Sequence, residues 1–540
     1  MHVCCVYIRN NINCSHELFH YELRYDIIPL GISYISSSLK QCGYTTEMLY
    51  CNPINYKESV DIIEKKPDVF AISVVSNSDY DLLEKLVVIF KKKYAEAKII
   101  VGGQHPTLAP NNILLNENID AICIGAGEVA IAEYVKQVEK GEYKKTDNLW
   151  IKNSDGSITK ADKVISIEDL DSIPFPDRKC WERWIHGDYK RHKISVGRGC
   201  KNHCIYCSNT MLSIVSNNVY IRHRSIDSIL KEINFIVKEY KEVQSIYFDD
   251  ENILTDKEFF KQLCLELKKY NDKLEQKINF SLKINFTPNL LDEDSDIILL
   301  MKEANIDWIQ FALESGSLEM RRRLNRPYYS NEQIIKFFGK LHEHKMHSMC
   351  YVMYCYPFEN KKTYLETVEC LKKCKPTIIE YSMLMPIENT ALYNLLKKIK
   401  YPNVSIIDKY RFFTLKWRVY KTYKSYKEAL FLAIEPFKIF SIIVNLYKKN
   451  ERRIYKLKEY YKNKAKEEFN NKNYKEAIKY FNKIKIKDDN YWIYGDRAVA
   501  KMNIGCYKDA LKDFDKVMEL EPTYVYKQKR QECLSLLNKK

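Results

Sequence analysis

The sequence predicts an α/β protein with two parallel-sheet domains, followed by an all-α C-terminal region. Two observations carry this prediction. From the start to about Trp150, and again from residues 191 to 410, short apolar runs alternate with amphipathic stretches of helical period, which is typical of parallel strands covered by helices. Beyond Tyr410 the strand pattern ends and amphipathic helices follow. At 540 residues the chain is too long for one core.

The first domain, residues 1–150, is predicted to be a doubly wound, Rossmann-like sheet. Its strand candidates include "HVCCVYI", "DVFAISVV", "KIIVGG" and "DAICIGAGE", with helical stretches between them. Ligands of open α/β sheets bind outside the carboxyl ends of the strands. The turns "VGGQHPT" and "IGAGEVA" are therefore the expected binding loops.

Residues 151–190 are predicted to be a linker. They contain "KNSDGSITK", which has the pattern of a hairpin, and "DSIPFPDRKCW", whose two prolines do not fit a helix interior or a central strand.

The second domain, residues 191–410, is predicted to be a partial (β/α)6 barrel. Its six strand candidates are "HKISVGRG", "QSIYFDD", "INFSLKINF", "WIQFALES", "HSMCYVMYC" and "TIIEYSML". In such barrels the active site gathers at the carboxyl ends of the strands.

Composition and charge narrow the class of protein. Hydrophobic residues make up 46% and charged residues 29%, no run of about 18 apolar residues occurs, and the N-terminus has no signal-peptide pattern. We therefore expect a cytoplasmic protein with reduced cysteines. The net charge is +16, but lysines and glutamates are interleaved without a basic block, so no nucleic-acid partner is expected.

Three cysteines lie close together in "VGRGCKNHCIYCSN", just after the first strand of the second domain: Cys200, Cys204 and Cys207. Thiolates suit iron-sulfur clusters and zinc. Structural zinc prefers four ligands, and His203, directly beside Cys204, tends to point away, which disfavours zinc. A four-iron cluster held by three cysteines keeps one iron free for a substrate.

A chance grouping of core cysteines is disfavoured as well. The flanking Gly197, Gly199 and Asn209 are typical of an exposed loop.

The segment "CKNHCIYC" has the spacing CxxxCxxC, with Tyr206 before the last cysteine, and resembles the signature of radical S-adenosylmethionine (SAM) enzymes. The resemblance implies a [4Fe-4S] cluster on Cys200, Cys204 and Cys207 whose open iron binds SAM. It also implies reductive cleavage of SAM to a 5′-deoxyadenosyl radical. A reductant such as flavodoxin or ferredoxin would supply the electron.

Further segments of the second domain resemble the same family. In "YFDDENIL" one of Asp249, Asp250 and Glu251 is expected to accept a hydrogen bond from the SAM ammonium group, although these acids also suit a helix cap. "FALESGS" resembles "GIESGS" and places Glu314 and Ser315 on the cofactor side. The following "LNRP" also matches the family and contains Arg326. The third strand adds two weaker candidates, Lys283 and Asn285.

Two later segments keep only part of the family pattern. "YVMYCYPFENKKTYLETVE" resembles a segment beginning "GLPGET" and retains Pro357, Glu359 and Thr367 without either glycine, so its backbone approaches a ligand less closely. "MPIENTALY" resembles "PGTPLY" and retains four residues: Pro386, Thr390, Leu392 and Tyr393.

The first domain resembles the cobalamin-binding domain that precedes many radical SAM barrels, on "IIPLGISYISSSLKQCGYTTEML", "VGGQHPTLAP" and "IGAGEVAIAEYV". The resemblance implies that Gly102 and Gly103 let the backbone approach the corrinoid, and that the other loop is lined by Gly125, Gly127 and Glu128. The DxHxxG signature of cobalamin mutases is absent, and His105 is interpreted as a turn residue. A relic domain that has lost its corrinoid is the alternative.

The C-terminal region contains a repeat. Ala465, Tyr474, Ala477 and Phe481 recur 33 positions later as Ala498, Tyr507, Ala510 and Phe514, and Pro522 closes the second copy. This pattern resembles tetratricopeptide repeats over residues 457–540, after a helical connector at 411–456. Such repeats offer a surface for a protein partner.

These resemblances imply a cobalamin-dependent radical SAM enzyme, most often a methyltransferase acting on an unactivated carbon of a small molecule or a peptide. The alternative from another class is an interaction protein whose barrel holds a cluster without turnover. A methylthiotransferase is disfavoured, because the tail is helical and the N-terminal cysteines lack cluster spacing: Cys4, Cys5, Cys14, Cys42 and Cys51.

Overall fold

The computed structural model describes residues 1–9, 28–53, 55–185, 189–216, 221–285, 296–326, 329–354, 356, 359–384, 386–398, 452–484, 491–520 and 524–538. These residues fall into two compact units, one with both sheets and one with the helices from Arg452 onward. Each unit is described separately.

The first sheet has seven strands in the order β2-β1-β3-β4-β5-β6-β7. Strands β1 to β5 run parallel, and β6 and β7 are antiparallel, so β6 and β7 form the hairpin that the sequence predicts. The bounds are β1 His2–Ile8, β2 Thr45–Cys51, β3 Val69–Ser73, β4 Lys98–Gly102, β5 Ala121–Cys123, β6 Leu149–Lys152 and β7 Ile158–Lys160.

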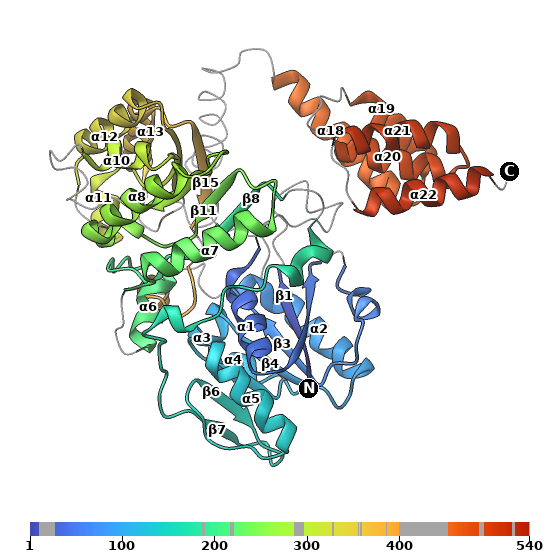
Figure 1. The fold of residues 1–540 in the computed structure, drawn as a ribbon, viewed down its shortest axis with the longest axis horizontal. Coiled ribbons are helices and arrows are strands. Elements are labelled where there is room, and N and C mark those ends of the chain that lie inside the picture. Colours follow the sequence, from blue (N-terminus) through green and yellow to red (C-terminus); the bar gives the residue numbers. More distant parts are fainter. Residues whose placement is uncertain are drawn as a thin grey trace. The chain divides into compact units, whose positions relative to one another are not determined.

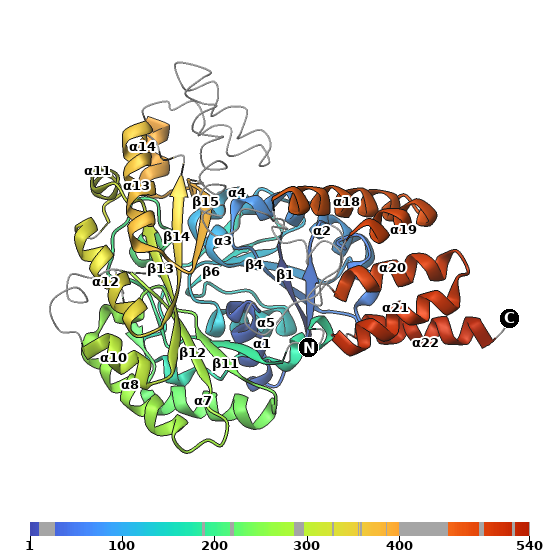
Figure 2. The ribbon, with the colours of Figure 1, turned by 90° about the horizontal axis from the view of Figure 1, so that it is seen from above.

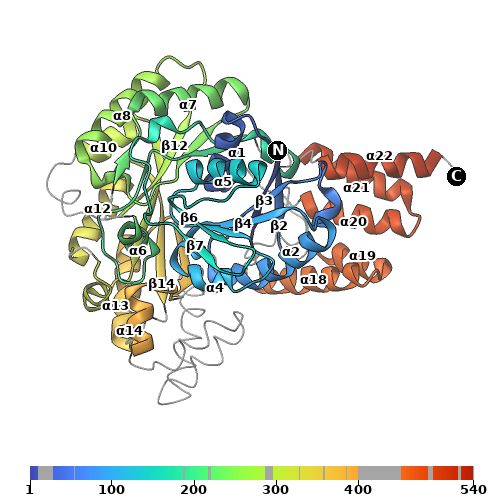
Figure 3. The ribbon, with the colours of Figure 1, turned by 90° about the horizontal axis from the view of Figure 1, so that it is seen from below.

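Helices cover both faces of this sheet, which confirms the Rossmann-like prediction. Helices α1 (Leu30–Gln41) and α5 (Glu128–Lys140) lie on one face, and α2 (Tyr80–Lys93) lies on the other (Figure 3). Two short helices follow β4, α3 (Gln104–Leu108) and α4 (Pro110–Leu114). The strand order reverses between β1 and β3, and ligands of such sheets bind at that point, outside the carboxyl ends.

The second sheet has six parallel strands in the order β15-β14-β13-β12-β11-β8 (Figure 1). This confirms the predicted series of six strands. The bounds are β8 Arg191–Ile194, β11 Ser245–Phe248, β12 Asn279–Ile284, β13 Ile306–Glu314, β14 His347–Tyr354 and β15 Ile378–Met383. A two-stranded ribbon, β9 (Gly197–Arg198) with β10 (Arg222–His223), follows β8.

The described helices of this domain lie along one face of the six-stranded sheet (Figure 2). They are α7 Ile226–Glu239, α8 Lys257–Asn271, α10 Asp296–Glu303, α12 Asn331–Glu343 and α13 Lys361–Cys374; the shorter α6 Ser208–Val215, α11 Leu318–Arg323 and α14 Ala391–Lys398 lie near the strand ends. Along β11 and β12 the apolar residues Ile246, Phe248, Phe280 and Leu282 are fully buried. The alternate residues belong to the opposite face and stay partly exposed.

The segment predicted to be a linker is fastened to α1. Ser37 Oγ donates to the carbonyl of Phe175 (2.6 Å), and Trp181 Nε1 donates to Ser33 Oγ (2.7 Å). Asp177 binds Lys40 at 2.6 Å. The segment also contains the short 3₁₀ helices η3 (Leu170–Ser172) and η4 (Lys179–Trp184); the others are η1 Ser59–Ile62, η2 Asn77–Asp79 and η5 Ile253–Thr255.

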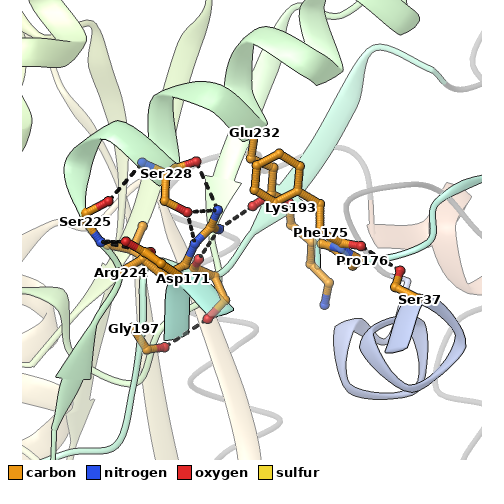
Figure 4. A network of polar contacts seen from close by, with 12 residues as sticks. Ser37, Asp171, Phe175, Pro176, Lys193, Gly197, Arg224, Ser225, Ser228 and Glu232 are labelled. Carbon is orange, nitrogen blue, oxygen red and sulfur yellow. Dashed lines mark hydrogen bonds and ion pairs between the residues drawn. The ribbon is translucent and has the colours of Figure 1, made fainter. Parts of the chain in front are cut away.

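The same segment is joined to the second domain by a buried cluster of charges (Figure 4). Glu232 on α7 is fully buried and accepts from Arg178 Nη2 at 2.7 Å and from Arg224 Nη1. The two arginines also donate to the carbonyls of Lys193 (2.7 Å) and Ser195 (3.0 Å) at the end of β8. We call the segment from Leu170 to Trp184 the strap, because it contacts both domains.

The C-terminal unit consists of helices, with bounds α18 Arg452–Asn470, α19 Tyr474–Lys483, α20 Tyr491–Asn503, α21 Tyr507–Leu520 and α22 Tyr524–Asn538. The repeated small and aromatic positions are fully buried in two clusters: Ala465, Ala477 and Phe481 in one, and Ala498, Ala510 and Phe514 in the other. Pro522 and the predicted connector up to residue 451 lie outside the described residues. None of the described helices is long and apolar enough to cross a membrane.

Candidate functional site

The three clustered cysteines occupy the loop between β9 and α6, beyond the carboxyl end of β8. Cys204 is buried, and Cys200 and Cys207 are partly exposed. Within the described ranges, no three His, Cys, Asp or Glu side chains are arranged to hold a single metal ion. The three thiols lie on one loop, and their arrangement does not form a site for a single metal ion.

Two family-like segments hold the backbone of this loop. Ile205 N donates to the carbonyl of Leu324 (3.1 Å), and Leu392 N donates to the carbonyl of Ile205 (2.8 Å). The Asn325 side chain donates to the carbonyl of His203 (2.8 Å). The "LNRP" and "TALY" segments therefore clamp the cysteine loop from two sides.

Asp250 binds the backbone at the start of the loop. Its carboxylate accepts from the N–H groups of Val196 (3.1 Å) and Gly197 (2.6 Å). Complete burial raises the pKa of Asp250 to about 8, against the effect of these hydrogen bonds. Gly197 has no room for a side chain, since a Cβ there would lie 2.7 Å from the carbonyl oxygen of Arg222.

The neighbours of Asp250 point elsewhere. Asp249 forms an ion pair with Lys193 at 2.8 Å. The charge of Glu251 acts on the thiols: burial raises the pKa of Cys200 and, to about 11, that of Cys207, and Glu251 adds to both shifts. Of the three acids predicted to bind the SAM ammonium group, Glu251 is the one whose charge acts on both of these cysteines.

Arg326 is a fully buried cation beside the cysteine loop. Its Nη1 lies 3.6 Å from Cys204 Sγ, and its Nη2 donates to the carbonyl of Ala312 and lies 3.5 Å from Asn285 Oδ1. The sequence motif singled out Arg326 without a role, and Asn285 as a weak candidate.

Glu314 lies at the end of β13 with a left-handed backbone, φ 64°. Burial raises its pKa, while the positive charges of Arg326 and Lys283 and a hydrogen bond from Tyr206 lower it. Tyr206 packs against an apolar cluster that holds the loop: Met320, Leu324, Tyr356, Leu384, Leu392, Tyr393 and Leu396. A left-handed non-glycine residue at the end of a strand is typical of functional sites.

Ser315 is fully buried and its hydroxyl is used inside the fold. It lies 3.1 Å from Thr367 Oγ1 and accepts from Ser317 N at 3.1 Å. Thr367 also accepts from Gly316 N at 2.9 Å. These contacts join β13 to α13, which differs from the expectation that Ser315 lies on the cofactor side.

The glycines of the first domain lie on the expected loops. At most of these positions a neighbouring residue leaves no room for a side chain. Gly103 has φ 111°, and a Cβ there would lie 2.5 Å from the carbonyl oxygen of Val74. Side chains at Gly125 and Gly127 would lie 2.7 Å from Val164 Cγ1 and 2.9 Å from Ile35 Cδ1. A Cβ at Gly102 would lie in ordinary contact with Cys123, 3.5 Å from its Cβ, so packing does not require a glycine there. His105, interpreted from the sequence as a turn residue, lies buried in α3.

The two binding regions are joined by direct contacts. Glu128, at the first residue of α5, forms an ion pair with Arg198 at 2.5 Å, two residues before Cys200. The same guanidinium lies over the Tyr34 ring, 5.2 Å from its centre. Gln104 Oε1 accepts from Ser208 Oγ, directly after Cys207, at 3.4 Å. The glycine loops of the first sheet therefore contact the segment that contains the cysteines.

Sequence reasoning missed Arg198 and Gln104. Both lie inside the quoted loop segments, but their roles depend on contacts between segments 70 and 104 positions apart. It placed Glu128 on the corrinoid loop, whereas its carboxylate pairs with Arg198.

The donor set fits the implied cofactors. Three thiols with an adjacent guanidinium and an adjacent carboxylate suit an iron-sulfur cluster and the ammonium group of SAM. The loops after β4 and β5 lie at the carboxyl edge of an open α/β sheet, where such domains bind their ligands.

Comparisons with known proteins match both domains. The model of the radical SAM superfamily matches residues 194–371, and that of the B12 binding domain matches residues 21–135. Cytidylyl-2-hydroxyethylphosphonate methyltransferase of Streptomyces wedmorensis is 22% identical over 371 residues, which are 58% of this chain and 66% of that protein. The chain thus spans slightly less than two thirds of the length of this curated relative.

Two solved structures are similar in fold. The radical SAM methyltransferase TsrM of Kitasatospora setae, with cobalamin and a [4Fe-4S] cluster bound, has a TM-score of 0.59 at 13% identity, over 74% of this chain and 75% of its own. The cobalamin-dependent SAM radical enzyme OxsB, with aqua-cobalamin and SAM bound, has a TM-score of 0.58 at 16% identity, over 74% and 61%.

The two matched domains imply three cofactors: a [4Fe-4S] cluster, SAM and cobalamin. Together with the three-cysteine loop beyond the first strand of a six-stranded parallel sheet, they show that the chain contains a B12-binding domain at residues 21–135 and a radical SAM domain at residues 194–371.

Proposed function

We propose that this protein is a cobalamin-dependent radical SAM methyltransferase that transfers a methyl group to an unactivated carbon. The observation that carries the proposal is the ion pair between Glu128 and Arg198. It joins the loop expected to bind the corrinoid to the segment that contains the cysteines. A methyl carrier and a radical source that serve one substrate must be neighbours.

Cys200, Cys204 and Cys207 hold the cluster in this proposal, and Glu251 accepts a hydrogen bond from the SAM ammonium group. When bound, the cluster and SAM supply a 5′-deoxyadenosyl radical that removes a hydrogen atom from the substrate, and cobalamin supplies the methyl group. Arg326 places its guanidinium against the Cys204 sulfur, and Tyr206, which donates to Glu314, packs on the apolar side of the cysteine loop.

Gly102 and Gly103, with Gly125 and Gly127, line the corrinoid in this proposal. Packing does not explain the glycine at position 102, which supports its part, while the positive φ of Gly103 and Gly125 shapes the loops. Glu128 acts by fixing the distance between the two loops.

The names of the relatives support methyl transfer. The curated relative from Streptomyces wedmorensis and the TsrM structure are both called methyltransferases. The substrate of this chain does not follow from those names.

We further propose that the C-terminal helices form tetratricopeptide-like repeats that bind a protein partner. The 33-residue offset and the equal burial of the repeated alanines and phenylalanines support this.

The proposal is tested by following the methyl group of SAM. The full chain is reconstituted anaerobically with iron, sulfide and cobalamin, then supplied with a reductant and SAM labelled in its methyl group. We expect labelled methylcobalamin, detected by mass spectrometry. A protein that binds cobalamin and yet forms none within many equivalents of SAM is not a methyltransferase of this kind.

A further inference from the structure

The face of the six-stranded sheet opposite the described helices carries several polar side chains. Residues on this face alternate with the buried apolar ones, and they include Tyr247 on β11, Lys283 on β12, Gln310 on β13 and Tyr351 on β14. All four are partly exposed. Lys283 pairs in register with Gln310, so the four residues share one region of the sheet.

One amide oxygen organises two of these side chains. Gln310 Oε1 accepts from Tyr351 Oη at 2.7 Å and from Tyr247 Oη at 3.2 Å. A phenol has a single proton. Each hydroxyl therefore donates its one hydrogen bond to Gln310. The oxygen of each phenol can still accept a hydrogen bond from a ligand on this face of the sheet.

Both phenols stay protonated at neutral pH. Burial raises the pKa of Tyr351 to about 12 and also raises that of Tyr247. The phenols therefore present neutral acceptors, not charged phenolates.

This group of side chains faces the region of the cysteine loop. The charge of Glu251 acts on Tyr247 as well as on the thiols of Cys200 and Cys207. The charge of Glu314, which accepts from Tyr206 beside the cysteines, acts on Tyr351 as well. The charge of Glu251 therefore acts on both Tyr247 and the thiols, and Glu314 interacts with both Tyr351 and Tyr206.

We propose that Tyr247, Gln310 and Tyr351 bind the substrate, and that the substrate is a polar molecule that presents hydroxyl or amine hydrogen-bond donors. The inference rests on the proposed function and adds to it the class of substrate. Two aligned acceptors favour a ligand with donors, and an apolar ligand leaves both phenol oxygens unpaired, at a cost for each. Lys193 and Asp249, paired at 2.8 Å on the neighbouring strands, continue the polar face.

Binding is tested on the full chain by saturation-transfer NMR, with glucose as the hydroxyl probe, putrescine as the amine probe and hexanoate as the apolar probe. We expect transfer to glucose or to putrescine, which identifies the donor group. The double variant Tyr247→Phe/Tyr351→Phe loses two acceptors, so we expect binding about tenfold weaker.

Two further variants sharpen the result. Tyr270→Phe removes a half-buried hydroxyl on α8 and should leave probe binding unchanged. Gln310→Glu keeps the acceptor that aligns both phenols and adds a negative charge, so it should strengthen putrescine binding. Hexanoate binding that equals polar binding, no transfer to either polar probe, or polar binding unchanged in the double variant overturns the proposal.

The second readout separates this inference from the proposed function. The reconstituted enzyme receives the better polar probe with deuterium on its carbons, and 5′-deoxyadenosine is examined for deuterium. In this step a C–D bond of the probe breaks and a C–D bond forms at C5′, which leaves a carbon radical on the probe. We expect enrichment that falls in the double variant. If no 5′-deoxyadenosine forms, the proposed function fails while the binding result stands. Perdeuterated palmitate serves as the apolar comparison. If 5′-deoxyadenosine gains deuterium from palmitate and not from the polar probe, the proposed substrate class fails.

Discussion

At the residue scale, three neighbouring acids after β11 have three different tasks. Asp249 pairs with Lys193, Asp250 accepts from two backbone N–H groups, and the charge of Glu251 acts on the Cys200 thiol. The alternation of side chains along an extended segment separates Asp250 from the other two acids. Their sequence predicts an acidic site, and only the direction of each side chain separates support from ligand binding.

The stability of the fold should depend on pH through Asp250. Its pKa is raised from 3.8 to about 8 in the folded chain, so the folded state holds this proton more tightly than the unfolded state. The free energy of unfolding should therefore fall as pH rises between these values, by at most about 1.4 kcal/mol per pH unit. Asp250→Asn keeps an acceptor for Gly197 and removes this loss.

Denaturant midpoints measured at pH 5 and at pH 8 check this expectation. At pH 8 the Asp250→Asn variant should have a higher denaturant midpoint than the wild type. At pH 5 the two midpoints should differ little. An equal difference at both values would mean that Asp250 is ionised throughout this range.

At the scale of elements, the sequence pattern predicts much and misses what depends on distant contacts. The alternation of apolar and polar residues locates all six strands of the second sheet, and the cysteine spacing locates the loop after β8. A motif names Ser315 without giving the direction of its hydroxyl, which contacts Thr367 in the folded chain. The strap has the prolines of a linker, yet its hydrogen bonds to α1 form only in the folded chain.

The contact between α5 and the ribbon β9–β10 should couple the two domains. Glu128→Gln and Arg198→Gln each remove one charge of a largely buried ion pair. We expect a coupling energy of about 1–3 kcal/mol in a double-mutant cycle of unfolding midpoints. Transfer of the SAM methyl group to cobalamin should fall more than 5′-deoxyadenosine formation, because the cysteine loop keeps its other supports.

Lys231→Gln serves as the control for this cycle. Lys231 forms an exposed ion pair with Asp227 on α7, which should contribute less than about 1 kcal/mol. Additive effects of the Glu128 and Arg198 variants would show that the two side chains do not act together.

At the scale of the sheet-bearing unit, the strap and the buried Glu232 set how the domains are joined. Glu232 is fully buried between two arginines. Glu232→Gln leaves these cations without their counter-charge, and we expect a loss of about 3–5 kcal/mol in the free energy of unfolding. Glu239→Gln on the same helix removes an exposed pair with Lys179 and should cost less than about 1 kcal/mol. Urea midpoints followed by tryptophan fluorescence distinguish them, since Trp181 lies in the strap; equal effects would contradict a supporting role for Glu232.

The most direct test of the whole account is the yield of 5′-deoxyadenosine, which requires no knowledge of the substrate. The reconstituted wild-type chain, with SAM and a strong reductant, should form it, and Cys200→Ala should not, although its circular dichroism spectrum matches that of the wild type. Equal yields from both proteins would contradict the assignment of the three-cysteine loop as the site of radical chemistry. So would a wild-type chain with a fully loaded cluster that forms none.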